Sequence, residues 1–131
     1  MIIEPIWVDK TEVLVIHDRQ LAQHGGSSGV RDESLLESAL ARPRNLFAYS
    51  EESVSLYRLA AAYSSGISSS HPFVDGNKRT ALVAAYLFLA LNGIEIKAAP
   101  EDAYLTFLGL AEGVVNEDEL AHWVAEHDAS Q

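Results

Sequence analysis

One stretch near the middle of the chain is apolar on every side of the helix that it would form. It reads Thr80-Ala81-Leu82-Val83-Ala84-Ala85-Tyr86-Leu87-Phe88-Leu89-Ala90-Leu91, and Asn92-Gly93 ends it. A helix at a protein surface keeps one polar face, so a helix that is apolar all round is surrounded by other elements. The run is too short to cross a bilayer, which takes about 20 residues. We therefore expect a soluble protein built around this central helix.

Helical periodicity also dominates the rest of the sequence and predicts an all-α fold. Asp9 with Glu12 and Asn116 with Glu119 have the spacing of capping boxes, which mark helix starts. The expected helices run from Lys10 to about His24, from after Asp32 to about Pro43, from after Ser53 into the serine-rich 64–70, from near Asn77 to Leu91, from Pro100 to Gly113, and from after Asn116 onward.

Two short segments lack the helical period. Residues 94–96 alternate like a strand, which allows one small extended hairpin, and residues 43–50 are expected to be extended. The chain has 131 residues, 48% of them hydrophobic, and shows no repeat or linker, which favours one domain over 1–131. The predicted architecture is a compact bundle of about six helices around the central helix.

The charge of the chain is strongly negative and unevenly placed. The formal net charge is −10, of which −8 belongs to the residues after Asn92. Proteins that bind DNA broadly carry a basic surface, so we expect no direct DNA binding. All six arginines lie before Gly93, so an anion site would lie in the first two thirds of the chain.

The amino-acid composition also bears on the compartment. The chain has no cysteine, which excludes disulfides, thiolate zinc sites and a cysteine nucleophile. No basic region followed by an apolar stretch opens the sequence, so we expect no signal peptide and a cytoplasmic location.

The turn before the central helix gathers several chemically active side chains. It reads His71-Pro72-Phe73-Val74-Asp75-Gly76-Asn77-Lys78-Arg79. The N-terminus of a helix binds anions through unpaired N–H groups and the helix dipole, and glycine lets the backbone approach a phosphate. Lys78 and Arg79 add positive charge, Asp75 is a candidate Mg²⁺ ligand, and His71 is a candidate general base. A general base, a metal ligand and an anion cradle together suit phosphoryl or nucleotidyl transfer.

A simpler interpretation makes this turn only a cap for a buried helix, with Asn77 as N-cap and the two cations in solvent. That interpretation leaves His71, Pro72 and Asp75 without a purpose, so we favour the functional one.

The nine residues resemble the signature of the Fic/Doc superfamily, His-Pro-Phe-x-(Asp/Glu)-Gly-Asn-(Gly/Lys)-Arg. The resemblance extends to the glycine-rich 25–32 and to 35–43, which look like the death-on-curing (Doc) toxin branch of type II toxin-antitoxin systems. It implies that His71 is the general base, that Asp75 binds Mg²⁺ and that Arg79 contacts phosphate. It further implies that Gly76, Asn77 and Lys78 form an anion hole for ATP, and that Phe73 anchors the loop.

Two positions favour one branch of this family. Relatives that transfer AMP usually have glycine at the position of Lys78 and a second arginine at the position of Leu82. The resemblance to Doc toxins implies transfer of the ATP γ-phosphate to a threonine of elongation factor Tu, which arrests translation. AMP transfer (AMPylation) to a protein hydroxyl is the alternative within the enzyme class. A catalytically inactive interaction module is the alternative of another class.

Regulation is predicted from a missing motif. Related proteins carry an inhibitory (Ser/Thr)-x-x-x-Glu-(Gly/Asn) helix, but Leu108 stands four residues before Glu112-Gly113, and no other Glu here precedes Gly or Asn. The resemblance therefore implies inhibition by a separate Phd-type antitoxin.

Weaker signals lie elsewhere. The resemblance implies that 43–50 is a flap that pairs with the target by strand addition; the alternative is a connecting loop with Phe47 and Tyr49 in the core. Arg42 and Arg44 are expected in solvent rather than at phosphates. The other histidines, His17, His24, His122 and His127, lack metal-site spacing and are expected to be core or surface residues.

Overall fold

The structure is a computed structural model that describes residues 3–130, and these residues form six α-helices without a β-strand. The all-α class and the number of helices are therefore as predicted. The helices are α1 (Lys10–His24), α2 (Glu33–Tyr49), α3 (Leu56–Ser70), α4 (Asn77–Leu91), α5 (Pro100–Ala111) and α6 (Glu117–Glu126).

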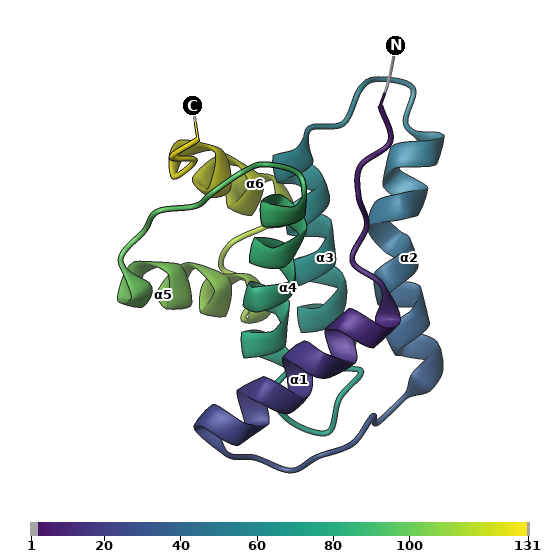
Figure 1. Ribbon diagram of the computed structural model, residues 1–131, viewed down its shortest axis with the longest axis vertical. Coiled ribbons are helices and arrows are strands. Elements are labelled where there is room, and N and C mark those ends of the chain that lie inside the picture. The colour runs from purple at the N-terminus through teal and green to yellow at the C-terminus, as the bar shows by residue number, and fades with distance from the viewer. Residues whose placement is uncertain (1–2, 131) are drawn as a thin grey trace.

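Helices α2, α3 and α4 stand side by side, and α1 crosses the lower end of this group (Figure 1). The apolar helix α4 packs against α1, α3 and α5, as its sequence predicts. Helix α3 is enclosed still further, because it contacts α2, α4, α5 and α6. The centre of the bundle is thus the α3–α4 pair, and the loop that joins these two helices carries the motif 71–79.

Helix α2 corrects the prediction for residues 43–50. The helix continues through Pro43 to Tyr49, so no extended flap exists at this place. Proline costs a helix one hydrogen bond, but Pro43 is buried on the face that already carries Leu36 and Leu40. Tertiary packing on this face outweighs the local signal of the proline.

The two aromatic residues of this segment have different environments. Phe47 packs against the core and meets the Trp7 ring edge-on at 5.7 Å between centroids. Tyr49 is 82% exposed, so the alternative that places both aromatic residues in the core is wrong for Tyr49.

Helix α3 shows why a serine-rich segment stays helical. It does not weaken at 64–70 but continues to Ser70, and Ser64 is fully buried, with its hydroxyl donating to the carbonyl of Ala81 on α4 at 2.7 Å. Gly66 lies against α2, where an added Cβ would stand 3.1 Å from the carbonyl oxygen of Ala39. Small residues therefore bring α3 close to both neighbours.

Ion pairs and apolar packing both link the C-terminal helix α6 to the bundle. Arg42 of α2 and Arg58 of α3 both donate to Glu117 of α6. Arg42 is exposed, as expected, although it also makes this ion pair. The strand-like 94–96 contributes a single bridge from Ile96 to Asp128 rather than a hairpin. Within residues 3–130, no helix has both the length and the apolar character needed to cross a membrane.

Candidate active site

The α3–α4 loop is held by its own residues in one conformation. His71 ends α3 with a left-handed backbone (φ 50°, ψ 59°), which is rare outside glycine. Asn77 then closes the loop: its Oδ1 accepts from the N–H of Phe73 and its Nδ2 donates to the Phe73 carbonyl, both at 3.0 Å. The Asn77 side chain is therefore engaged by the backbone of Phe73, and its own backbone N–H lies in the uncapped first turn of α4.

A second loop, residues 25–32, lies along the first and fixes it from outside. Val30 and Phe73 form an antiparallel bridge, and the N–H of Val74 donates to the Gly29 carbonyl at 3.0 Å. The Arg31 side chain donates to the carbonyl of His71 at 2.7 Å and to that of Ser70 at 2.8 Å. The arginine thus supplies hydrogen bonds and positive charge to the C-terminal end of α3.

Phe73 is buried, as predicted for an anchor, and its partner is a residue whose role the sequence did not indicate. The ring of His17 on α1 stacks on Phe73 at 3.9 Å between centroids, and His17 Nε2 lies 2.7 Å from the Asp75 carbonyl oxygen. The prediction for His17 was a core or surface histidine, and its buried position agrees with the first. Its contact with the motif joins residues 58 positions apart.

The predicted site residues surround one cleft of about 500 Å³. His71, the run 74–79 and Tyr104 of α5 line it, together with the end of α1 and the turn at 24–26. Helix α4 starts at Gly76 without a side-chain cap, so the N–H groups of its first turn are left for a ligand. The His71 ring is exposed and has no hydrogen-bond partner among the described residues, which leaves it able to accept a proton.

Asp75 supplies the one carboxylate among the described residues that line this cleft. Its Oδ1 accepts from the N–H of Gly76 at 2.9 Å and its Oδ2 from the N–H of Ser27 at 3.3 Å. Within the described residues, no group of three or more potential ligands forms a ready metal site. Because Mg²⁺ is commonly held by one or two carboxylates plus substrate phosphates, Asp75 fits a metal that arrives with a nucleotide.

Arg79 is half-buried and held from two sides. Its Nη1 lies 3.4 Å from His24 Nε2, and its guanidinium lies over the Tyr104 ring, 5.1 Å from the centroid. Among the described residues, no carboxylate pairs with it. Lys78 is exposed at the same rim, so two cations face the cleft in a protein of net negative charge.

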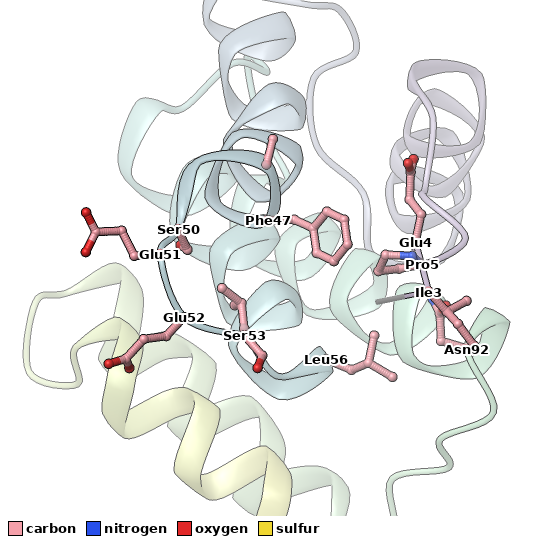
Figure 2. Close-up of a pocket in the computed structure, with 12 residues that line it drawn as sticks. Ile3, Glu4, Pro5, Phe47, Ser50, Glu51, Glu52, Ser53, Leu56 and Asn92 are labelled. Atoms are coloured by element: carbon pink, nitrogen blue, oxygen red, sulfur yellow. The ribbon is translucent and has the colours of Figure 1, made fainter. Parts of the chain in front are cut away.

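A larger cavity of about 680 Å³ lies at the other end of α4, where Asn92 helps to line it. Figure 2 shows Phe47 reaching into this cavity, while the carboxylates of Glu51 and Glu52 extend away from it. Its described lining contains glutamates but no histidine, lysine or arginine. It lacks the base and the cations of the smaller cleft, so the smaller cleft is the candidate active site.

Comparison with known proteins identifies the family of the chain. The Fic/DOC family model matches residues 7–89, which include α1 to α3, all but the last two residues of α4, and both loops of the cleft. The chain belongs to the Fic/DOC family. Its relatives place it on the Doc branch: "Protein kinase doc" of Escherichia phage P1 is 35% identical over 114 residues, covering 87% of this chain and 89% of the relative. "Toxin Doc" of Mycolicibacterium smegmatis is 42% identical over 74 residues, covering 56% of this chain and 57% of the relative.

An element outside the family match also lines the candidate cleft. Helix α5 lies beyond residue 89, yet its Tyr104 lines the cleft, and the Arg79 guanidinium lies over the Tyr104 ring. An aromatic residue at this distance along the chain gives no local sign of such a contact, and the sequence did not predict it.

Proposed function

We propose that this Fic/DOC protein is a Doc-type toxin that transfers the γ-phosphate of ATP to a hydroxyl of a protein target, with elongation factor Tu as the expected target. The observation that carries the proposal is the cleft itself, where a free imidazole, one carboxylate and an uncapped helix N-terminus converge. The printed name of the phage P1 relative, a protein kinase, supports phosphate as the transferred group.

The roles of the residues follow from their positions. His71 takes the proton of the target hydroxyl while the oxygen of that hydroxyl forms a bond to the γ-phosphorus of ATP. The bond between the γ-phosphorus and the oxygen that bridges it to the β-phosphate breaks, and ADP leaves. The N–H groups at the start of α4, with Lys78 and Arg79, stabilise the negative charge that develops on the phosphate. Mg²⁺, held by Asp75, would neutralise phosphate charge.

AMP transfer is the second candidate, and two positions argue against it. Leu82 stands where AMP-transferring relatives usually have a second arginine, and here it is half-buried against the core. Lys78 replaces the usual glycine of those relatives and adds a side chain at the rim of the anion site. Neither position suits a nucleotide bound with its α-phosphate at the base.

Isotope labelling decides between the two transfers. The purified protein is incubated with elongation factor Tu and with ATP labelled either at the γ or at the α position. We expect label only from the γ position, and mass spectrometry should find one added phosphate on a threonine. Label from the α position alone would overturn the kinase proposal in favour of AMP transfer. The absence of label from both would count against this target.

Inhibition would come from a second protein. Arg79 contacts His24 and Tyr104 rather than a carboxylate of the described chain, in line with the missing inhibitory motif. We expect the chain to arrest bacterial growth when expressed alone and to be tolerated when a Phd-type antitoxin is coexpressed. Normal growth with abundant folded protein and no antitoxin would contradict this.

A further inference from the structure

His17 is a buried residue that meets the motif loop at three points. Only 3% of it is exposed, although it is a polar residue on the first helix. Its ring covers Phe73, its Nε2 is 2.7 Å from the Asp75 carbonyl oxygen, and an added Cβ on Gly76 would stand 3.6 Å from the same ring. Because a carbonyl oxygen only accepts, His17 must be protonated at Nε2 to make this bond.

The contact fixes one peptide plane at the centre of the site. In a trans peptide the carbonyl of one residue and the N–H of the next point in opposite directions. His17 holds the Asp75 carbonyl on the α1 side, and the N–H of Gly76 therefore points the other way. There it donates to Asp75 Oδ1 at 2.9 Å. One hydrogen bond thus sets the direction of an N–H at the start of α4 and, through it, that of the Asp75 carboxylate.

We infer that His17 is a positioning residue, which orients the Asp75–Gly76 peptide so that the Asp75 carboxylate and the Gly76 N–H face the cleft. His17 itself does not line the cleft, so it acts through the loop rather than on substrate. Its relation to the activity rests on the proposed function, whereas its effect on the loop does not. The tests below separate the two.

The first test needs no substitution and no substrate. Nitrogen-15 NMR of the imidazole in the intact protein reports which ring nitrogen carries the proton. We expect Nε2 of His17 to carry a hydrogen-bonded proton. The Nδ1–H tautomer would overturn the inference, because Nε2 would then have no proton to donate.

The second test compares two substitutions of similar shape. In His17→Gln the amide nitrogen can still donate near the position of Nε2, whereas in His17→Met a thioether of similar length cannot. We expect the Gly76 amide resonance to move or broaden in the methionine variant and to return toward its original position in the glutamine variant. Equal shifts in both variants, with equal thermal unfolding midpoints, would mean that His17 only fills space.

The third test reads the consequence for catalysis. Substitution of a residue that orients a metal ligand typically lowers metal affinity or activity by about 10–100-fold. We expect His17→Met to lower kcat at least tenfold and to raise the Mg²⁺ concentration needed for half-maximal rate, with KM for the protein target unchanged and with partial recovery in His17→Gln. An equal loss in both variants, or a change confined to KM, would contradict a positioning role. If no activity is found with any target, the two NMR tests still decide the role of His17 in the loop.

Discussion

At the scale of single residues, the backbone of His71 restricts how the proposed base can be replaced. Its left-handed conformation is tolerated best by glycine, asparagine and aspartate. His71→Asn therefore removes the imidazole with little strain, and we expect a folded protein whose transfer rate falls about 10²–10⁴-fold and which no longer arrests growth. His122→Asn, an exposed histidine of α6, is the matched control. Toxicity that survives His71→Asn would favour the interaction-module alternative over catalysis.

Gly26 is a second single residue with a defined effect on the site. Its φ is +120°, and an added Cβ would stand 2.8 Å from Asp75 Oδ2. Gly29 is the matched control, since its φ is +112° and its nearest neighbour, Val74 Cγ2, would be 3.7 Å away. Backbone strain of this kind costs about 1–3 kcal/mol, so we expect both alanine variants to lose stability in denaturant unfolding.

Only Gly26→Ala should also displace the Asp75 carboxylate, and we expect its transfer rate to fall about tenfold or more below that of Gly29→Ala. Steady-state rates at saturating ATP and varied Mg²⁺ measure this difference. Equal rates in the two variants would show that the carboxylate tolerates the added methyl group.

At the scale of whole elements, the closeness of α2 and α3 depends on Gly66. Valine at this position would overlap the Ala39 backbone, and overpacking of a core costs about 1–3 kcal/mol. We expect Gly66→Val to lower the free energy of unfolding by this amount. Ser69→Val places the same side chain on an exposed part of α3 and should change stability far less. A comparable loss in both variants would count against the α2 contact as the cause, because valine has a higher helix propensity than glycine and one similar to that of serine.

The elements also show which parts of the fold could be predicted from local sequence. Both capping boxes form as expected, because each depends on residues three apart. The end of α2 was not predictable, since Pro43 signals a stop locally and is overruled by packing against a helix that follows it in the chain. The motif allowed its own cleft residues to be predicted. The residues that contact it, His17 and Tyr104, belong to helices distant in the sequence, and nothing in their local sequence indicates these contacts.

At the scale of the whole molecule, some of the acidic residues that concentrate in the C-terminal part of the sequence pair with arginines of other helices. The net −8 after Asn92 includes Glu117 and Asp118, which face arginines of α2 and α3 rather than the cleft. Part of the C-terminal acidity is thereby neutralised by the N-terminal part of the chain. The cations that stay at the cleft, Lys78 and Arg79, have no carboxylate partner among the described residues.

Glu117 links α6 to both α2 and α3, because it accepts hydrogen bonds from Arg42 and from Arg58, and its side chain is only 11% exposed. Asp118, the next residue, is 77% exposed and meets Arg58 alone, yet it shares the first turn of α6 and so has the same relation to the helix dipole. Hydrogen bonds between charged groups contribute about 1.5–3 kcal/mol when sheltered, and exposed pairs about 0–1 kcal/mol.

We expect Glu117→Ala to lower the free energy of unfolding by about 2 kcal/mol and Asp118→Ala by less than about 1 kcal/mol. Urea unfolding at low and high salt measures both values, and the salt dependence should be weaker for the sheltered pair. Equal losses in the two variants would show that α6 is held by its apolar residues Leu120 and Val124 alone.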